Sequence, residues 1–459
     1  MENQKELPGA PRENKMGTMP IGKLILTMSL PMMISMLVQA MYNIVDSIFV
    51  AQISENALTA VSLAFPMQML MIAVGGGTGV GVNALLSKRL GEKRFDEANS
   101  VANNGIFLAL CSYILFLLLG LFVAPVFFAV QTDIAEIRDG GTIYLQIVQC
   151  MSFGLFGQFI TERLMQSTGK TVFSMITQGV GAIINIILDP IMIFGYFGFP
   201  AMGIAGAALA TVVGQIVAAI VGLILNIRCN REITINPMKY RPNGKTIGAI
   251  YKIGIPSIIM QSIGSIMTVC MNAILLGFSS TAAAVFGVYF KLQSFIFMPV
   301  FGLNNGIVPI VGYNFGAGYR DRMMKTIRIA CTYAVIIMFV GIAVMEIFPA
   351  QLFSMFEASE QMLAIGVPAL RIISLSFVFA GYCITVGSVF QALGNGMYSL
   401  IVSVVRQLVV LLPVAYLMSL TGNINLVWLS FPIAELASVA LSTYFLIRIY
   451  NKVIRHVGK

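Results

Sequence analysis

Long apolar runs dominate this chain and leave few folds open to it. Many of them exceed the roughly 18 residues that cross a ~30 Å hydrocarbon layer as a helix. Only 10% of the residues are charged, whereas a soluble domain carries about 25%. The alternating segments of ~10 residues that are typical of a membrane β-barrel are absent, and Leu, Ile, Met and Ala fill the runs instead. The sequence therefore predicts an all-α, polytopic membrane protein.

Twelve membrane-spanning helices can be placed along the chain. We expect them at residues 23–52, 57–86, 99–124, 140–162, 170–197, 202–228, 248–277, 281–314, 325–350, 361–390, 397–420 and 424–449. No small-residue cleavage site follows the first run, so that run is interpreted as a retained span rather than a signal peptide. The expected organisation is a polar tail (1–22), an N-lobe of six spans (23–228), a linker (229–247), a C-lobe of six spans (248–449) and a second tail (450–459).

Lys and Arg are divided unevenly between the two sets of loops. Twelve spans place both termini on one side of the membrane. Of the 28 basic residues, 24 share that side, in segments 1–23, 88–94, 163–170, 228–252, 320–328 and 448–459. Because basic residues accumulate in cytoplasmic loops, we expect a cell-membrane protein with both termini in the cytoplasm. This topology accounts for the net charge of +9, so binding to nucleic acid is not needed to explain it.

Residues that carry enzyme or metal chemistry are sparse. The six cysteines are scattered without a CxxC pair, and the single histidine, His456, lies in the C-terminal tail. Metal sites, disulfide frameworks and hydrolytic triads therefore have no support, and we expect neither an enzyme nor a cofactor. The glycine-rich run at 75–79 lies inside a predicted span and lacks the Gly-Lys-Ser/Thr of a phosphate loop, so we interpret it as close helix packing.

The chain repeats itself at an offset of 225 residues. The informative matches are Pro31 with Pro256, Gln68 with Gln293, Gly77 with Gly302, Gly81 with Gly306, Gly91 with Gly316 and Asp96 with Asp321. Six spans per half is an even number, so the halves enter the membrane in the same orientation. Such pseudo-symmetric parallel repeats are typical of rocker-type transporters, whose substrate cavity lies between the halves near mid-membrane.

Two acids lie inside predicted spans of the N-lobe, where an ionisable group costs about 2.5–3.5 kcal/mol at the helix centre. At 1.5 Å per residue, Asp46, Asp189 and Thr211 lie ~9, ~12 and ~13 Å below the outer ends of their spans. Asn185 shares a helix face with Asp189, and Pro190 leaves a helix carbonyl without its donor. We expect Asp46, Asn185, Asp189 and Thr211 to form a coupling site for H⁺ or Na⁺. The alternative is a hydrogen-bonded structural pair of aspartates.

Polar stripes run along the first span of each lobe, at spacings of three and four residues. A polar stripe in a span should face a cavity or the bundle interior, so we expect cavity-lining roles for Gln39, Tyr42 and Asn43 in the N-lobe, and for Gln261, Ser265, Thr268 and Asn272 in the C-lobe. At the repeat offset Met271 replaces Asp46. The lobes are therefore predicted to be unequal, with ion chemistry in the N-lobe.

Three further charges, Lys291, Arg406 and Glu435, lie deep inside predicted C-lobe spans. An unpaired charge at that depth is costly, so we expect the three to approach one another in a structural network; a role in substrate binding is the alternative. Pro31 lies ~22 Å along the first helix from Asp46 and breaks its backbone ladder, which makes Pro31 a candidate hinge.

Three stretches together resemble the MATE (multidrug and toxic compound extrusion) family, and the similarity covers nearly the whole chain. They are residues 31–50 around Asp46, 185–195 around Asp189, and 203–211. The resemblance is to the bacterial branch with its cation site in the N-lobe. The seventh and tenth spans, which carry acids in the other bacterial pattern, have none here apart from Glu360 just before the tenth.

The resemblance implies secondary active efflux, in which amphipathic or cationic drug-like compounds leave the cell in exchange for inward H⁺ or Na⁺. Antibiotic resistance and a monomer embedded in the lipid bilayer are part of the same expectation. The alternative is a flippase of a lipid-linked precursor. It would need a strongly basic cavity for pyrophosphate, which the acidic N-lobe disfavours, although Lys291 and Arg406 keep it open. A membrane enzyme would need convergent His, Cys or acid groups at the membrane surface, and the sequence offers none.

Overall fold

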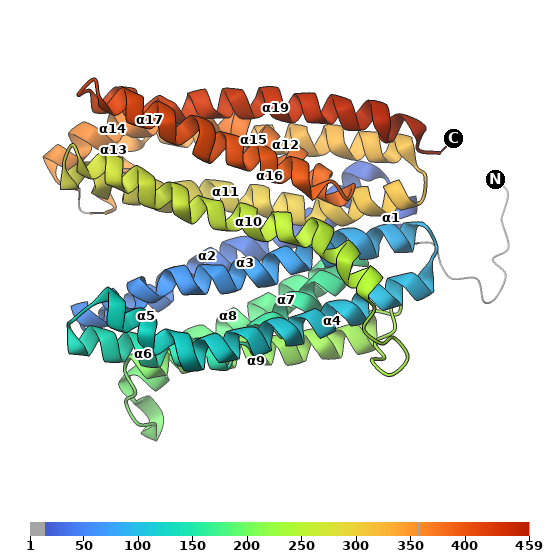
Figure 1. The fold of residues 1–459 in the computed structure, drawn as a ribbon, viewed down its shortest axis with the longest axis horizontal. Helices are drawn as coiled ribbons and strands as arrows, with labels where there is room; N and C mark the ends of the chain where they lie inside the picture. The colour runs from blue at the N-terminus through green and yellow to red at the C-terminus, as the bar shows by residue number, and fades with distance from the viewer. Residues whose placement is uncertain (1–13, 357, 459) are drawn as a thin grey trace.

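The computed structural model describes residues 14–356 and 358–458, and in this part of the chain helices run side by side along the long axis of the molecule (Figure 1). Ten helices in the described residues are long and apolar enough to cross a membrane. Two bent helix pairs bring the number of spans to twelve if each pair counts as one. The all-α polytopic fold is confirmed. Residues 1–13 of the predicted polar tail lie outside the described residues.

In the described part of the chain, the N-lobe contains eight α-helices and one π-helical stretch. They are α2 (Ile21–Ala51), α3 (Glu55–Gly91), α4 (Phe95–Leu118), the π-helix η1 (Leu119–Val123), α5 (Ala124–Gln131), α6 (Ala135–Cys150), α7 (Phe153–Ser167), α8 (Thr171–Phe194) and α9 (Ile204–Cys229), preceded by the short α1 (Lys15–Thr18). A 3-10 turn, η2 (Tyr196–Gly198), lies between α8 and α9.

The C-lobe follows a similar order of elements. They are α10 (Gly244–Leu276), α11 (Ser280–Gly316), α12 (Arg320–Ile347), α13 (Pro349–Ser354), α14 (Glu360–Ser374), α15 (Phe377–Ala392), α16 (Gly396–Val404), the π-helix η3 (Val405–Leu411), α17 (Leu412–Ser419), α18 (Ile424–Trp428) and α19 (Ser430–Lys452), followed by the 3-10 turn η4 (Ile454–His456). The π-helix of the C-lobe interrupts the counterpart of α8, and an additional short helix, α18, precedes the last long helix.

The repeat seen in the sequence is a repeat of helices. Adding 225 to the bounds of α3 gives those of α11. The same shift applied to α8 gives 396–419, the stretch from the start of α16 to the end of α17. Each helix of the N-lobe therefore has a counterpart in the C-lobe at the expected offset.

Two spans that were predicted as single helices are sharply bent. The predicted spans 140–162 and 361–390 are the pairs α6–α7 and α14–α15, bent by 44° and 49°. The breaks lie at residues 151–152 and 375–376, and neither contains a proline or a glycine. Hydropathy and helix-breaking residues therefore do not predict either bend. The π-helices have a clearer cause. η1 and η3 each directly precede a proline in the next helical turn, Pro125 and Pro413, which cannot complete the α-helical bonding pattern.

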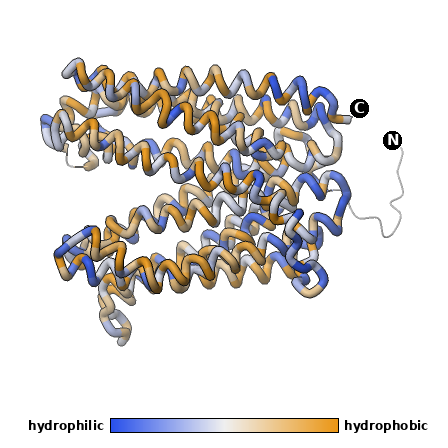
Figure 2. Tube along the Cα trace, in the orientation of Figure 1, coloured by the Kyte–Doolittle hydropathy of each residue, from blue (hydrophilic) through white to orange (hydrophobic). Residues whose placement is uncertain are grey.

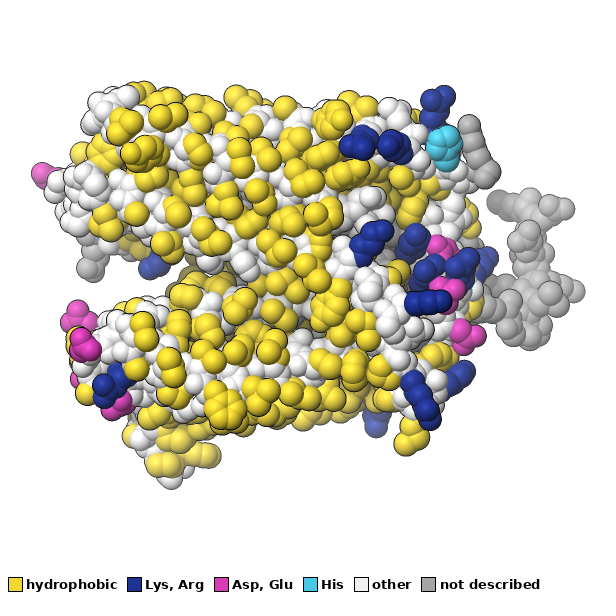
Figure 3. Space-filling view, viewed as in Figure 1, with side chains coloured by type: hydrophobic (Ala, Val, Ile, Leu, Met, Phe, Trp, Pro, Cys, Tyr) yellow, Lys and Arg dark blue, Asp and Glu magenta, His cyan; other side chains and the backbone are white. Residues whose placement is uncertain are grey.

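The lobes meet at one end of the molecule and separate toward the other (Figure 1). Residues 16 and 458 contact α11 or the turn after it at the closed end, which we call the termini end. At the opposite end, the open end, the space-filling view is hollowed between the lobes (Figure 3). Hydrophobic residues run along the helices, while hydrophilic residues gather at the two ends (Figure 2). On the face shown, Lys and Arg are concentrated at the termini end (Figure 3).

Glycines from both repeats form the contact between the lobes. A Cβ added at Gly77 of α3 would stand 2.4 Å from Cγ1 of Ile258 in α10. A Cβ at Gly302 of α11 would stand 2.5 Å from Cα of Met33 in α2. Met33 and Ile258 are themselves repeat partners. The glycine-rich run at 75–79 therefore serves close helix packing, as the sequence predicts.

The same symmetry governs the termini end. A Cβ at Gly91 would lie 2.0 Å from the carbonyl oxygen of Tyr313, and a Cβ at Gly316 would lie 2.1 Å from that of Lys88. Neither site has room for a larger residue in this arrangement. The two contacts are repeat equivalents, so the lobes close at this end through a pseudo-twofold pair of glycine contacts.

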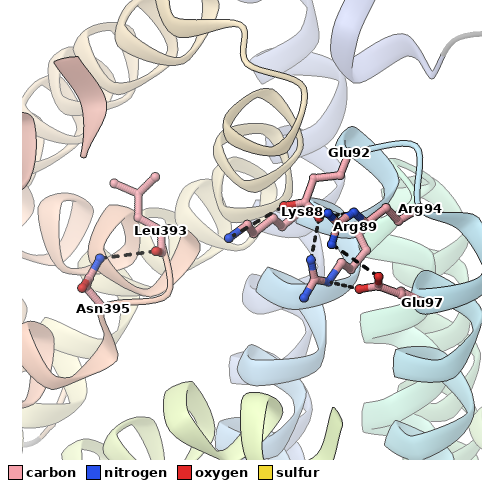
Figure 4. A network of polar contacts seen from close by, with 7 residues as sticks. All are labelled: Lys88, Arg89, Glu92, Arg94, Glu97, Leu393 and Asn395. Carbon is pink, nitrogen blue, oxygen red and sulfur yellow. Dashed lines mark hydrogen bonds and ion pairs between the residues drawn. The ribbon is translucent and has the colours of Figure 1, made fainter. Parts of the chain in front are cut away.

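Ion pairs stabilise the turn that follows Gly91. Arg89 contacts Glu92 at 2.6 Å and Glu97 at 3.0 Å, and Lys88 contacts Glu92 at 3.9 Å (Figure 4). Within the turn Lys93 has a positive φ of 58°, and its repeat partner Gly318 has a φ of 76°. Both halves thus use a left-handed residue to leave the same long helix.

Part of the predicted polar tail is packed against both lobes. Asn14 donates a hydrogen bond to the carbonyl oxygen of Thr168 in the N-lobe, at 2.9 Å. Asn314 of the C-lobe donates to the carbonyl oxygen of Met16, at 3.0 Å. The side chain of Met16 is fully buried. Residues 14–19 therefore bridge the lobes at the termini end.

Candidate cation site in the N-lobe

Glycines bring α8 and α9 together directly beside the predicted acids. A Cβ at Gly214 of α9 would lie 2.8 Å from the carbonyl oxygen of Gly181 in α8, and 3.3 Å from Cβ of Asn185. One turn further along α8, Asp189 is fully buried, and Asn185 is only 3% exposed. The close packing of these two helices thus places an amide and a carboxyl group in the interior of the lobe.

The structure brings the four residues of the predicted coupling site together. The side-chain amide of Asn185 donates to Oδ1 of Asp189 at 3.4 Å and to the hydroxyl of Thr211 at 3.3 Å. Asp46, on α2, reaches the same place, and its carboxyl group lies against that of Asp189. A proton on either carboxyl would be shared with the other as a hydrogen bond. Three helices therefore converge on one polar site.

Several oxygens of this site are left without a donor. Oδ1 of Asp46, Oδ1 of Asn185 and Oδ2 of Asp189 are buried and accept no hydrogen bond from any described residue. Buried acceptors normally have partners, and two neighbouring carboxylates repel each other unless a positive charge lies between them. Carboxylate, amide and hydroxyl oxygens suit a proton or a hard cation such as Na⁺ better than a thiophilic metal. The geometry fits the binding of one small cation.

Two residues that the sequence analysis did not select border the site. Nε2 of Gln68 in α3 donates to the hydroxyl of Tyr144 in α6, at 2.9 Å. Tyr144 is 3% exposed and lies within electrostatic reach of Asp46 and Asp189. The match of Gln68 with Gln293 in the repeat could have identified Gln68 as a candidate. No sequence pattern pointed to Tyr144, because a lone tyrosine in a span is common at packing positions.

A third acid, Glu162, is also buried in the N-lobe, with 6% of its surface exposed. Nε2 of Gln158 donates to its Oε1 at 2.9 Å, and Tyr42 lies within electrostatic reach of Glu162, Asp46 and Asp189. The predicted span ended at residue 162, which made Glu162 a helix-end residue. Helix α7 in fact continues to Ser167, so this acid belongs to the interior of the lobe.

The polar stripe of α2 is divided between the lobe interior and the surface. Nε2 of Gln178 in α8 donates to Oε1 of Gln39 at 3.0 Å, and the hydroxyl of Ser35 donates to Oε1 of Gln178 at 3.0 Å. Gln39 therefore ties α2 to α8. Tyr42 is half-buried beside the acids, and Asn43 is exposed.

Among the described residues, the C-lobe stripe on α10 has no comparable network with its own lobe. Gln261 and Ser265 are exposed, and Thr268 and Asn272 are half-buried. The side chain of Gln261 lies beside Gly76 of the other lobe, and the hydroxyl of Thr268 donates to the carbonyl oxygen of Gly264 at 2.9 Å. The stripe is uncharged, as the sequence shows.

Of the three residues in the predicted C-lobe charge network, Arg406 and Glu435 form a pair, and Lys291 lies elsewhere. Nη1 of Arg406 donates to Oε1 of Glu435 at 2.8 Å. The expectation that Lys291 joins them is wrong. Lys291 is exposed, and its Nζ lies over the ring of Phe356, 5.8 Å from the centroid. The face of an aromatic ring attracts an ammonium group, so Lys291 has a partner other than Glu435. Pro31 is buried, and α2 continues through it as a helix.

Among the described residues, ten to twelve apolar spans in two repeated lobes, with a pair of carboxyl groups inside the N-lobe, are typical of a membrane transporter. A family model matches this chain in both halves, over residues 31–191 and 256–417. The chain belongs to the MatE family, the family whose motifs the sequence resembles.

Relatives of known name cover almost the whole chain. The multidrug export protein MepA of Staphylococcus haemolyticus is 28% identical over 440 residues, 94% of each chain. The protein of the same name from Staphylococcus aureus strain MRSA252 is 28% identical over 441 residues, again 94% of each chain. A solved structure described as the outward-facing conformation of a multidrug resistance MATE family transporter has a TM-score of 0.90 and 23% identity, with 96% of this chain and 98% of that chain covered. This structural likeness confirms the fold.

Proposed function

We propose that this protein is a secondary antiporter that exports amphipathic, often cationic compounds from the cell in exchange for inward H⁺ or Na⁺. The exported class follows the names of the relatives, which are multidrug export proteins. One observation supports the coupling: the carboxyl groups of Asp46 and Asp189 lie together in the N-lobe, with buried oxygens that no described residue satisfies.

The pair supports coupling because its charge changes when a cation binds. With neither proton nor Na⁺ bound, two negative charges face each other in a poorly solvated place. A bound cation removes the repulsion and lets α2 and α8 approach. Asp46 belongs to α2, which also packs against the C-lobe through Met33. A change at Asp46 can therefore alter the contact between the lobes, and with it the affinity of the cavity for a drug. By linkage, the drug must change the cation affinity by the same factor.

The membrane orientation belongs to the same proposal. We place the termini end in the cytoplasm, because the basic residues concentrate there, and the open end outside the cell. A cysteine at the exposed Asp133, in a cysteine-free background, should then react with an impermeant thiol reagent added outside intact cells. Reaction only after the cytoplasm is exposed would reverse the orientation.

Transport in proteoliposomes tests the function directly. The purified protein is reconstituted, and movement of a fluorescent lipophilic cation is followed under an imposed pH gradient, an imposed Na⁺ gradient, or neither. Antiport predicts uphill dye movement under at least one gradient and none without a gradient. Equal dye movement in all three conditions would contradict antiport. A matched variant, Glu346→Gln, alters an acid at an outer helix end that pairs with the exposed Arg371 at 3.9 Å, and it should transport normally.

A further inference from the structure

The Arg406–Glu435 pair lies on the C-lobe counterparts of the two helices that carry most of the N-lobe site. Arg406 lies in η3 and Glu435 in α19, the counterparts of α8 and α9, which carry Asn185, Asp189 and Thr211 in the N-lobe. At the offset of 225, Arg406 corresponds to Gly181 and Glu435 to Ala210. Both lobes therefore place buried polar groups between the same two helices.

The two helix pairs are packed differently. In the N-lobe, Gly181 and Gly214 let the backbones of α8 and α9 touch. In the C-lobe their counterparts are Arg406 and Val439, so a long side chain extends between the helices. The π-helical turn before Pro413 widens the helix at this point. This local geometry gives Arg406 room to reach across to α19.

Arg406 donates a hydrogen bond to only one of the two carboxylate oxygens of Glu435. Glu435 is 7% exposed, and its Oε1 accepts from Arg406 at 2.8 Å. Its Oε2 is buried and accepts no hydrogen bond from any residue the structure describes. Tyr289, itself 2% exposed, lies within electrostatic reach of both charges. Without Arg406, Glu435 would be an acid buried in the lobe, as Asp189 is in the N-lobe.

We infer that Glu435 is a latent site for a small monovalent cation, H⁺ or Na⁺, which Arg406 holds permanently occupied with its guanidinium group. Arg406 is thus a tethered cation that takes the place of an exchangeable one. The Arg406–Glu435 pair stays neutral whatever the ion gradient, and exchange is confined to the N-lobe. The comparison with the N-lobe rests on the proposed function, but the charge state of Glu435 can be tested without transport.

The test measures thermal stability of the purified protein between pH 6 and 9, in choline chloride and in NaCl. In Arg406→Met the carboxyl group must take up a proton or Na⁺ to stay buried. Its melting temperature should therefore fall below that of the wild type by about 5 °C or more at pH 9 in choline chloride. High pH removes the proton, so the deficit should shrink toward pH 6. If Na⁺ also fits the site, NaCl should shrink the deficit at pH 9; if it does not, the bound cation is H⁺ alone.

Two further variants separate this account from simple loss of a contact. Glu435→Gln leaves an unpaired guanidinium, which stays charged throughout this range, so it should lose stability without the pH trend. Arg406→Met combined with Glu435→Gln contains no buried charge, and it should recover stability and lose the trend. An exposed control, Arg371→Met, should match the wild type.

A deficit in Arg406→Met that is absent, or equal at pH 6 and 9, would overturn the inference. So would a double variant that keeps the pH trend or fails to fold, because no charge then remains to be compensated. If the stability results agree while Asp46→Asn still supports coupled transport, the latent C-lobe site stands and the proposed N-lobe function fails.

Discussion

At the scale of single residues, Asn185 organises the candidate site. Its amide nitrogen contacts both Asp189 and Thr211, whereas its oxygen is left free beside the carboxyl groups. One side chain therefore orients an acid through its donor and offers a ligand through its acceptor. For the side chain of Thr211 the structure describes one hydrogen bond, from Asn185, and Thr211 is half-buried. Thr211 should therefore contribute less than Asn185 to cation affinity.

This difference gives a graded prediction. Asn185→Ala removes both bonds and the free oxygen, and each bond of this kind contributes about 1 kcal/mol. We expect the H⁺ or Na⁺ concentration for half-maximal dye efflux to rise about tenfold or more in Asn185→Ala, and less than about fivefold in Thr211→Val. The measurement is the ion dependence of efflux in proteoliposomes. A larger effect of Thr211→Val than of Asn185→Ala would contradict the assigned geometry.

Residue types predicted some of these positions and missed others for physical reasons. Asp46 and Asp189 were visible because an acid in an apolar run is costly. Glu162 was hidden because the bend at residues 151–152 moves the end of its span, and no breaker residue marks that bend. The prediction for Lys291 was wrong because depth in the membrane does not determine the direction of a side chain. Its neighbour is the ring of Phe356, in the turn after α13, and not Glu435 of α19.

At the scale of elements, α1 and the residues around it act as a strap across the termini end. Arg322 of α12 donates to the carbonyl oxygens of Met16 and Met19, at 3.0 and 2.7 Å. On the N-lobe side, Asn14 donates to Glu232, in the linker between α9 and α10. The strap is therefore attached on both sides of the termini end, and one side must release it if this end opens.

Glu232 makes the attachment sensitive to pH. Burial raises the pKa of its carboxyl group above the ordinary 4.5, although the hydrogen bond from Asn14 and the nearby Lys170 and Lys15 act to lower it. The attached state therefore binds the proton more readily than the released state. Attachment should strengthen as the pH falls through the raised pKa toward 4.5, and it should lose this contribution above that pKa.

Hydrogen exchange of residues 14–19, corrected for the intrinsic rate, measures this effect. We expect greater protection at about pH 5 than at about pH 7 in the wild type, and equal protection at both in Glu232→Gln. Burial also lowers the pKa of Lys15 from 10.5, so the comparison is kept on the acid side of neutrality. Protection that rises with pH in the wild type would contradict this account of the strap.

At the scale of the whole molecule, the repeat determines how the lobes touch. Gly91 and Gly316 are repeat partners. Gly91 packs against the carbonyl oxygen of Tyr313, and Gly316 packs against that of Lys88. A methyl group at either position would need backbone to move, because 2.0 Å is far below any contact distance. The closed termini end seen here therefore depends on two glycines, which the sequence marked as repeat matches without revealing their contacts.

Alanine at both positions should push the termini end apart and shift the molecule toward closure of the open end. Spin labels at Glu55 and Ser280, exposed repeat partners at that end, report the change. In a cysteine-free background we expect a shorter label distance in Gly91→Ala with Gly316→Ala. Gly179→Ala is the control, since no atom lies within 4 Å of its added Cβ. An unchanged distance in the double variant would show that the glycines do not set the conformation.

In the proposed mechanism, the ion gradient acts on the protein at Asp46 and Asp189. The most direct measurement is gradient-driven dye efflux in proteoliposomes, made with equal amounts of folded wild type, Asp46→Asn, Asp189→Asn and the control Glu346→Gln. Because we propose that the two acids bind the cation as a pair, we expect either asparagine variant to lose gradient-driven efflux while it remains inserted and still binds dye. Glu346→Gln should transport like the wild type. Full transport by Asp46→Asn at normal protein levels would contradict the mechanism.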